Sequence, residues 1–242
     1  MANFYITKDM IHGSLAVIDN EEARHIKNVL RMKKGDELVL CDGEGNFHEA
    51  VIAKLDEKSV EAEIIRSYTA ETEPKIKITL YQGVPKNPKL ETIVQKATEV
   101  GVVRVVPVDT VRAVAKIDKE AKIDRLRKIA KEAAKQSKRA IVPEVSSVMS
   151  FKDAIDEASE ADIKIIAYEN EKEVSVKETL QKADGTSVAL IIGPEGGFEE
   201  KEIEYAKSMG ITSVSLGKRI LRTETAGLCV SAVILYEKGE MQ

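Results

Sequence analysis

Two short segments near the C-terminal end of the chain combine glycine, carboxylate and arginine residues in a pattern suited to ligand binding. The first is Ile-Ile-Gly-Pro-Glu-Gly-Gly-Phe at residues 191–198, and the second is Leu-Gly-Lys-Arg-Ile-Leu-Arg-Thr-Glu-Thr-Ala at residues 216–226. Each is an apolar stretch that runs into a glycine-rich or polar loop before a helix, which is where open α/β sheets bind their ligands. We therefore predict one pocket with two walls.

The charges of the first loop restrict which ligand this pocket can bind. A glycine-rich turn at the start of a helix ordinarily offers backbone N–H groups to a phosphate. Here Glu195, Glu199 and Glu200 occupy that place and would repel a phosphate group. The chain also contains no G-x-G-x-x-G, P-loop or G-x-S-x-G pattern. We infer a ligand other than a bare polyphosphate, bound largely through backbone groups.

Each segment also has a purely structural interpretation. Residues 193–197 can be a simple turn between a strand and a helix, and Thr223-x-x-Ala226 can be an ordinary helix start. The two segments, taken singly, leave both interpretations open.

Taken with three further stretches, however, the segments resemble the SPOUT methyltransferases, and specifically the family that methylates N3 of a uridine in 16S ribosomal RNA. The matching stretches occur in the family order through nearly the whole chain. They are residues 25–31 with 34–36 and 42–43, residues 95–101, residues 132–139 with 142–143, and the two C-terminal segments.

This resemblance implies that the chain binds S-adenosylmethionine and transfers its methyl group. Gly193, Gly196 and Gly217 suit a close approach of the backbone to the cofactor, and apolar neighbours suit cover for its adenine ring. The residues assigned to the cofactor are Tyr168, Ile192, Gly193, Pro194, Glu195, Gly196, Leu216, Gly217, Ile220, Leu221, Thr225 and Ala226.

The implied reaction needs a group that stabilises negative charge. Uracil N3 carries a proton at neutral pH and must lose it before it attacks a methyl group, which leaves charge on the two uracil oxygens. A positioned cation would stabilise that anion. From the resemblance and from this chemistry we assign the cation to Arg222, with Glu224 as its orienter or as the proton acceptor. The alternative is an ordinary salt bridge at the end of a helix.

A basic segment stands out from an otherwise acidic chain. The net charge is −4, yet residues 112–139 contain eleven Lys and Arg against four Asp and Glu, a local charge of +7. Local positive potential is sufficient for contacts with RNA phosphates, although a lysine-rich helix can equally be a solvated face. The candidate RNA-binding residues are Arg31, Arg112, Lys131, Lys135, Gln136 and Arg139.

Length and composition indicate a soluble protein of one large or two small domains. The chain has 242 residues, 43% of them hydrophobic, and no apolar window reaches the length of a membrane span. Its first residues lack the features of an export signal. Cys41 and Cys229 have no metal-ligand or redox spacing, and we expect no metal site. These features favour a cytoplasmic location.

The pattern of the chain changes near residue 74. Residues 1–70 contain short strands, a helix around residues 21–30 and a hairpin turn at residues 42–45, which together favour a small β-barrel. The resemblance makes this barrel PUA-like and RNA-associated, and the polar residues 67–74 read as a linker. Residues 74–242 alternate strands with helices, as in a parallel α/β sheet. The resemblance makes this part a SPOUT methyltransferase domain with a trefoil knot.

Two helices of the second part have predicted limits. Asn87 and Pro88 are a suitable N-cap and first residue for a helix that ends at Gly101. The last helix, residues 223–237, is apolar around most of its circumference, so its own sheet or a second subunit must cover it. We expect a homodimer, which the resemblance also implies.

Three positions depart from the family pattern. Asn3 stands where an arginine is common, which weakens the expectation of an RNA contact near the start of the chain. Asn87-Pro88 replaces a usual Gly-Asp, and Lys138 replaces a small residue.

The predicted function is transfer of a methyl group from S-adenosylmethionine to N3 of a specific uridine in small-subunit ribosomal RNA, either naked or within an assembled subunit. A SPOUT enzyme acting on a ribose 2′-hydroxyl or on transfer RNA is the nearest alternative. A non-catalytic RNA-binding protein of ribosome assembly is the alternative from another class. The presence of both C-terminal segments favours an enzyme.

Overall fold

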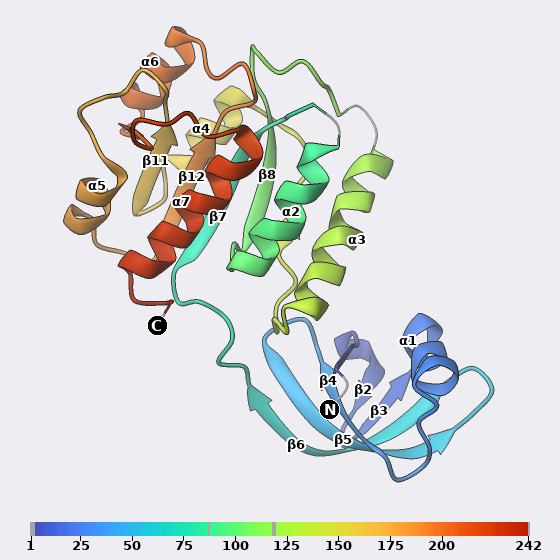
Figure 1. Ribbon diagram of the computed structural model, residues 1–242. Helices are drawn as coiled ribbons and strands as arrows, with labels where there is room; N and C mark the ends of the chain where they lie inside the picture. The colour runs from blue at the N-terminus through green and yellow to red at the C-terminus, as the bar shows by residue number, and fades with distance from the viewer. Residues whose placement is uncertain (1–2, 87, 118–119, 242) are drawn as a thin grey trace. The chain divides into compact units, whose positions relative to one another are not determined.

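The computed structural model describes residues 3–86, 88–117 and 120–241. The chain forms two compact units, the first from Met1–Glu73 with Ala134–Val142 and the second from Pro74–Ala133 with Pro143–Gln242 (Figure 1). The sequence placed everything from residue 74 onward in one domain. The structure differs, because residues 134–142 pack with the first unit.

The first unit is built on a six-stranded sheet with the order β1-β4-β5-β6-β3-β2. Its strands are β1 (Asn3–Tyr5), β2 (Ile11–His12), β3 (Leu15–Ile18), β4 (Glu37–Cys41), β5 (Asn46–Leu55) and β6 (Val60–Thr69). Its short helical segments are η1 (Lys8–Met10), α1 (Asn20–Arg24) and the π-helical turn η2 (His25–Val29). Alternate residues of the strands point inward, so Phe4, Ile18 and Leu40 are almost fully buried in one core.

The predicted hairpin connects β4 to β5. Gly43 and Gly45 have φ angles of +74° and +106°, which residues with a Cβ rarely adopt. The carboxylate of Asp42 accepts hydrogen bonds from the backbone N–H groups of Glu44 and Asn46, at 2.8 and 3.0 Å. This side chain therefore fixes the turn from within, as Asp commonly does in tight turns.

Strand β6 extends into the polar run that was predicted as a linker. It continues to Thr69, where it pairs with Asn46 of β5. The side chains of its second half have no apolar period, so the periodicity could not show the strand. Backbone hydrogen bonding to β5 decides the structure here instead.

The second unit is built on a seven-stranded sheet whose strand pairs are all parallel. The strand order is β10-β8-β7-β12-β11-β13, and β9 pairs with β8. The strands are β7 (Lys77–Gly83), β8 (Arg104–Asp109), β9 (Glu144–Val145), β10 (Met149–Ser150), β11 (Ile163–Ala167), β12 (Ser187–Ile192) and β13 (Thr212–Val214). The predicted parallel sheet is confirmed.

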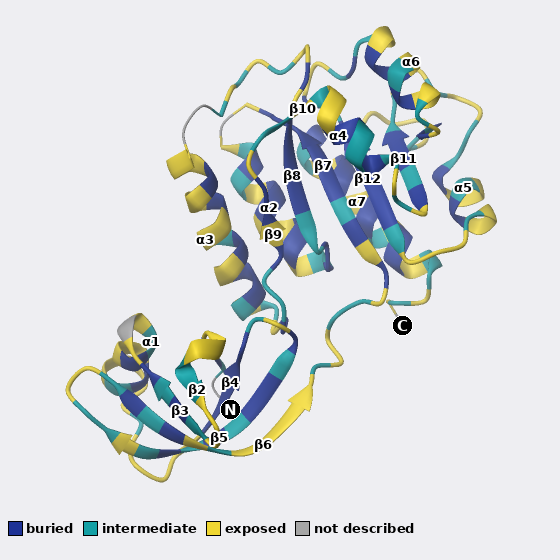
Figure 2. Ribbon diagram, turned by 180° about the vertical axis from the view of Figure 1, so that it is seen from behind, coloured by how far each residue is buried: buried dark blue, intermediate teal, exposed yellow. Residues whose placement is uncertain are grey.

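Helices cover both faces of this sheet, which explains why its central strands are apolar along their length. They are α2 (Lys89–Val100), α3 (Glu120–Gln136), α4 (Phe151–Ala158), α5 (Val176–Lys182), α6 (Glu200–Ser208) and α7 (Thr223–Glu237). The two ribbon views show α2 and α7 side by side on one face and α4 on the opposite face (Figures 1 and 2). The strands between them are largely buried (Figure 2).

Helix α2 begins at Lys89, and the predicted N-cap at Asn87 lies outside the described residues. The helix ends where predicted, at Gly101, which has a φ of +118°. The N–H of Gly101 donates to the carbonyl oxygens of Ala97 and Thr98. Glycine suits this helix-terminating conformation because it lacks a Cβ.

Helix α7 has the limits predicted for the last helix. One face, which includes Ala226, Val230 and Ile234, is buried against the rest of the unit. A Cβ at Gly227 would lie 3.3 Å from the Cδ atoms of Leu80, so this glycine allows the helix to pack closely on β7. The opposite face is exposed.

Candidate active site

The carboxyl ends of β11, β12 and β13 carry the loops that form a pocket in the second unit. Tyr168 follows β11, residues 193–198 follow β12, and residues 215–217 follow β13. Because neighbouring parallel strands end at the same edge of a sheet, the three loops meet there. The pocket has a volume of about 310 Å³, within the range of small-molecule sites.

Most residues assigned to the cofactor line this pocket. They are Tyr168, Ile192, Gly193, Pro194, Glu195, Leu216, Gly217, Ile220, Leu221 and Ala226. Gly196 and Thr225 are not among the lining residues. A Cβ at Gly196 would lie 3.1 Å from Cβ of Arg112, so Gly196 faces that arginine. Thr225 is exposed in the first turn of α7.

Other lining residues were not assigned to the cofactor from the sequence. They are Lys89, Ala167, Glu169, Gly197, Phe198, Ser215, Arg219, Arg222 and Thr223. Lys89 lies about one hundred positions before the two motifs, so only the fold brings it to them. The remainder are neighbours in sequence of predicted residues, and a wider window around each motif would have included them.

The glycine-rich loop is a compact turn with little space for larger side chains. Gly197 has a φ of +66°, and its N–H donates to the carbonyl oxygen of Pro194 at 3.0 Å. A Cβ at Gly193 would lie 3.2 Å from the ring of Phe198. A Cβ at Gly83, the last residue of β7, would lie only 2.6 Å from Pro194. The loop therefore packs directly against the end of β7.

Thr223 joins the two predicted motifs. Its hydroxyl donates to the carbonyl oxygen of Gly193 at 2.6 Å and accepts a hydrogen bond from Nε2 of Gln82 at 2.8 Å. Thr223 and Gln82 are both buried. The hydroxyl therefore does not cap its own helix, and the backbone of Arg222 occupies the N-cap position of α7. Two separate segments thus form one wall of the pocket.

Lys89 supplies a cation between two carboxylates at this site. Its Nζ lies 3.0 Å from Oε1 of Glu195 and 3.1 Å from Oε2 of Glu224. Burial raises the pKa of Glu195, but hydrogen bonds from backbone N–H groups and Lys89 outweigh it and lower that pKa. The pKa of Glu224 is also lowered, first by its own backbone N–H and then by Lys89 against the effect of burial. Both groups are carboxylates at neutral pH.

Arg222 lies at the N-cap of α7 and lines the pocket, as its predicted role requires. Its side chain is exposed, and its carbonyl oxygen accepts the N–H groups of Thr225 and Ala226 at 2.8 and 2.9 Å. Glu224, predicted to orient Arg222, instead forms its ion pair with Lys89. The alternative interpretation, an ordinary salt bridge between Arg222 and Glu224, therefore does not describe this pair.

Arg112 lies beside the glycine-rich loop. Its Nη1 donates to the carbonyl oxygen of Gly196 at 3.2 Å, and the residue is exposed to solvent. An arginine held this way keeps further N–H donors for a second partner. Its position next to the pocket is compatible with the predicted contact to RNA.

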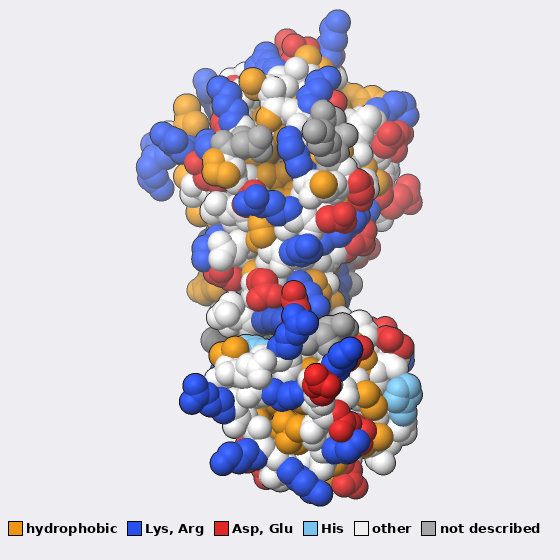
Figure 3. Space-filling view, turned by 90° about the vertical axis from the view of Figure 1, so that its right-hand side faces the viewer, with side chains coloured by type: hydrophobic (Ala, Val, Ile, Leu, Met, Phe, Trp, Pro, Cys, Tyr) orange, Lys and Arg blue, Asp and Glu red, His pale blue; other side chains and the backbone are white. Residues whose placement is uncertain are grey.

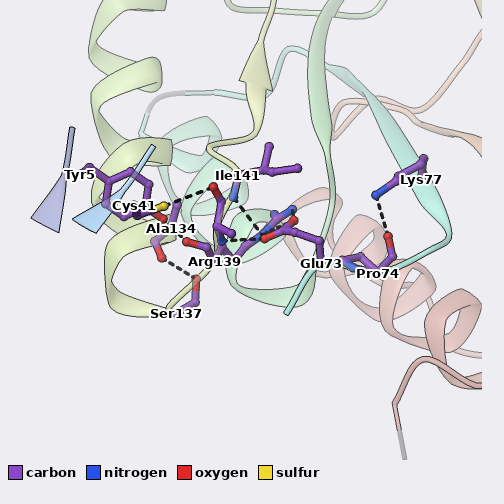
Figure 4. A network of polar contacts seen from close by, with 10 residues as sticks. Tyr5, Cys41, Glu73, Pro74, Lys77, Ala134, Ser137, Arg139 and Ile141 are labelled. Atoms are coloured by element: carbon purple, nitrogen blue, oxygen red, sulfur yellow. Dashed lines mark hydrogen bonds and ion pairs between the residues drawn. The ribbon is translucent and has the colours of Figure 1, made fainter. Parts of the chain in front are cut away.

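Arg139 does not have the exposed position that the sequence predicted for an RNA contact. It is 4% exposed, and its Nη2 lies 2.6 Å from Oε2 of Glu73 (Figure 4). The same carboxylate accepts the backbone N–H of Ala140 at 2.9 Å, and the Tyr5 hydroxyl donates to the Arg139 carbonyl oxygen. Arg139 is therefore a buried structural residue of the first unit, because its charge is satisfied by a carboxylate distant in sequence.

The other basic candidates differ in their surroundings. Arg31 and Lys131 are exposed, as is Gln136, whereas Lys135 is half-buried and forms an ion pair with Glu22. Figure 3 shows Lys and Arg side chains spread over one face of each unit, with acidic side chains between them. Neither unit shows a purely basic surface in this view.

Lys138 has a φ of +56°, a conformation that favours glycine. It follows the end of α3, where its N–H donates to the carbonyl oxygen of Lys135 at 3.2 Å. This geometry explains why a small residue suits the position, since helices commonly end on a left-handed residue.

Glu171 organises the loop that follows β11. Its Oε2 accepts the Ser213 hydroxyl at 2.6 Å, and its Oε1 accepts the N–H groups of Lys172 and Glu173 at 3.1 Å each. The Ser213 hydroxyl and these backbone donors lower the pKa of Glu171 to about 2. The loop begins at Tyr168, so Glu171 fixes one rim of the pocket to β13.

Neither a metal-ligand cluster nor a membrane-spanning helix occurs in the described parts of the chain. No three His, Cys, Asp or Glu side chains there are grouped as metal ligands. None of the helices described has the length and apolar character required of a membrane span.

Comparisons with known protein families agree with this site. A family described as RNA methyltransferase domain matches residues 71–235, and one described as RNA methyltransferase PUA domain matches residues 18–65. Ribosomal RNA small subunit methyltransferase E of Bacillus subtilis is 37% identical, over 91% of this chain and 89% of that protein. The protein of the same name from Mesomycoplasma hyopneumoniae is 34% identical, over 88% and 90%.

Solved structures give the same result. Ribosomal RNA small subunit methyltransferase E from Neisseria gonorrhoeae, bound to S-adenosyl methionine, has a TM-score of 0.86 and 31% identity over 98% of this chain and 97% of that chain. A methyltransferase from Legionella pneumophila in complex with the same cofactor has a TM-score of 0.84 and 31% identity, over 97% and 96%.

Proposed function

This chain belongs to the RNA methyltransferase family whose curated members are named ribosomal RNA small subunit methyltransferase E, and from that premise we propose that it methylates N3 of a uridine in small-subunit (16S) ribosomal RNA. The methyl donor is S-adenosylmethionine. One observation carries the assignment: the two sequence motifs lie side by side in one pocket, joined by the hydroxyl of Thr223.

The pocket suits this methyl donor in shape and charge. Gly193 and Gly217 line its wall, while Ile192, Leu216 and Leu221 provide apolar cover for an adenine ring. The lining carries the carboxylates of Glu169 and Glu195, which are compatible with a cationic sulfonium, together with Lys89, Arg219 and Arg222. When bound, S-adenosylmethionine supplies an electrophilic methyl group.

The side chains of the site act on the uracil. N3 would lose its proton to solvent, its electron pair would form the bond to the methyl carbon, and the methyl–sulfur bond would break, leaving S-adenosylhomocysteine. Arg222, which lines the pocket, stabilises the negative charge on the uracil oxygens before transfer. Glu224 is a poor proton acceptor because its pKa is lowered, so we assign it a positioning role.

RNA contacts are proposed for each unit separately. In the second unit, Arg112 beside the pocket loop and Lys131 on α3 are exposed and basic. In the first unit, Arg31, Lys135 and Gln136 remain candidates, and Arg139 is removed from the set because it is buried. Ribosomal RNA as substrate also supports the expected cytoplasmic location.

We further propose that the protein is a homodimer in which α7 contacts a second copy. The exposed face of α7 carries Cys229, Val233 and Tyr236, with Val233 45% and Tyr236 70% exposed. Apolar side chains at helical spacing are expected to be covered. Light scattering at micromolar concentration should give the dimer mass, and a monomer would contradict the proposal. The trefoil knot also stays a proposal, supported by the family.

Methyl mapping on ribosomal RNA tests the function directly. Cells with and without the gene should differ at one uridine of the small-subunit RNA, and mass spectrometry of nucleosides should identify the methyl group on the base. A methyl group on ribose, or on transfer RNA, would favour the related enzymes instead. No difference in any methyl mark would support a non-catalytic RNA-binding protein.

A further inference from the structure

Lys89 occupies a position that helix stability alone does not favour. It is the first residue of α2, a helix of 12 residues. The N-terminus of a helix carries partial positive charge, so a lysine there is normally unfavourable. Nearby carboxylates must compensate for this unfavourable charge, and their position indicates the role of the lysine.

The compensating carboxylates come from the two pocket motifs. Glu195 belongs to the glycine-rich loop, and Glu224 to the first turn of α7. Lys89 bridges them at 3.0 and 3.1 Å, with its side chain 26% exposed and in the pocket lining. Three segments, each from a different part of the sequence, are therefore connected through one ammonium group.

Glu224 depends on Lys89 in particular. Its Oε2 atom is buried and accepts no other hydrogen bond in the described structure, so the ammonium at 3.1 Å is the partner of that oxygen. Glu195 is less dependent, because the backbone N–H of Lys86 also donates to its carboxylate, at 3.2 Å. Removing the lysine would leave Glu224, whose side chain is 24% exposed, without its ion-pair partner, and only its own backbone N–H and the more weakly acting Arg222 would still stabilise its charge.

We propose that Lys89 is a positioning residue for methyl transfer. Through its ion pairs with Glu195 and Glu224, it holds the glycine-rich loop and the start of α7 in a fixed position relative to each other. This inference rests on the proposed function. Arg222, the charge-stabilising residue, immediately precedes the first turn that Glu224 anchors. Lys89 therefore acts through Glu224 on the placement of Arg222, rather than by contact with the uracil.

The proposal predicts a change in rate that exceeds the change in cofactor affinity. Lys89→Met should lower the single-turnover rate by about one to two orders of magnitude, the scale of loss from misplacing a catalytic group by about 1 Å. Cofactor affinity, measured by calorimetry, should change less than the rate. Lys89→Arg should restore most of the rate, because the cation is kept.

The pH dependence separates this role from simple loss of packing. Without Lys89, Glu195 and Glu224 lose the cation they share, Arg222 is the remaining cation nearby, and the pKa values of both carboxyl groups should rise. The acidic limb of the rate profile should then move to higher pH in Lys89→Met and return in Lys89→Arg. A packing defect would lower the rate equally at all pH values.

Thermal unfolding without cofactor gives a readout independent of activity. In the natural protein, the lowered pKa values of Glu195 and Glu224 correspond to stability that is present above the ordinary value of 4.5 and is lost as the pH falls through the lowered values. Lys89→Met removes the part of this stability that comes from the ammonium group. The destabilisation relative to the natural protein should therefore be full at pH 7 and smaller at pH 3, where the carboxyl groups begin to be protonated. Lys96→Met is the matched control, since Lys96 lies on the same helix and pairs at 2.8 Å with exposed Glu99.

The outcomes distinguish the two proposals. If the natural protein methylates uracil N3 but Lys89→Met keeps its rate and pH profile, the positioning role is wrong and the function stands. If Lys89→Met loses cofactor binding in proportion to rate, Lys89 holds the cofactor instead, and the proposal is also wrong. If the natural protein does not methylate ribosomal RNA, the proposed function itself fails.

Discussion

The hydroxyl of Thr223 lies 2.6 Å from the carbonyl oxygen of Gly193, and this hydrogen bond joins two motifs that are thirty residues apart in the chain. Gln82, from a third segment, donates to the same hydroxyl. Both neighbours would lose a partner if the hydroxyl were removed. The relative position of the two motifs in the pocket wall therefore depends on the Thr223 hydroxyl.

Replacing Thr223 should weaken both the fold and the pocket. Thr223→Val keeps the side-chain shape but removes one hydrogen bond each from Gln82 and from the carbonyl oxygen of Gly193, and the loss of these two bonds costs about 1–3 kcal/mol of unfolding free energy. Cofactor affinity should fall with it, because Gly193 is no longer fixed. Denaturant unfolding and calorimetry measure the two effects. Thr223→Ser, which keeps the hydroxyl, is the control and should stay close to the natural protein.

Arg222 should affect rate more than binding. If it stabilises the uracil anion, Arg222→Ala should lower single-turnover methylation by about two to three orders of magnitude. Cofactor affinity should change much less, because the interaction strengthens in the transition state. Arg219→Ala, a neighbouring arginine of the pocket lining, is the matched comparison. Normal turnover by Arg222→Ala would remove the catalytic assignment.

Glu171 should make the protein sensitive to acid. Its folded pKa of about 2 lies below the ordinary value of 4.5, so its stabilising contribution is present above pH 4.5 and is lost as the pH falls toward 2. Glu171→Gln removes this titration, and its stability should fall less steeply over that range. Thermal unfolding between pH 5 and pH 2.5 tests this directly. Parallel curves for the two proteins would show that Glu171 does not contribute.

Arg139 should matter for the fold rather than for RNA. Arg139→Ala leaves Glu73 as an unpaired buried charge, a change that typically costs about 3–5 kcal/mol. RNA affinity per folded molecule should remain unchanged. The exposed Lys131, changed to Ala, should give the reverse result, with stability kept and a smaller salt dependence of RNA binding. A folded Arg139→Ala protein with weakened RNA binding would restore the original assignment.

Sequence patterns predicted those parts of the molecule whose signals are local. The limits of α7 at Thr223 and Glu237, the hairpin turn at Asp42 and the end of α2 at Gly101 all follow from neighbouring residues. The two C-terminal motifs also predicted most of the pocket lining, because each lies directly after a strand.

Pairings between distant segments could not be predicted in this way. Lys89 meets Glu195 and Glu224 only because α2 and α7 lie on the same face of the sheet. Arg139 has the spacing of an exposed basic residue, and its burial depends on Glu73, 66 positions earlier. Periodicity shows which residues are apolar, but it does not show which charged residues acquire a buried partner.

The first unit contains residues from two separate parts of the chain, so its folding during synthesis depends on when the second part is made. Ala134 and Ala140 pack in one apolar cluster with Val39, Cys41 and Phe47. A nascent chain that has emerged only as far as Glu73 therefore lacks part of its core and the cation for its buried carboxylate. The core around Phe4 and Leu40 contains only residues before Glu73, but the second apolar cluster can be completed only after Val142 has left the ribosomal tunnel. Until then the nascent chain exposes an apolar surface on which chaperones can act.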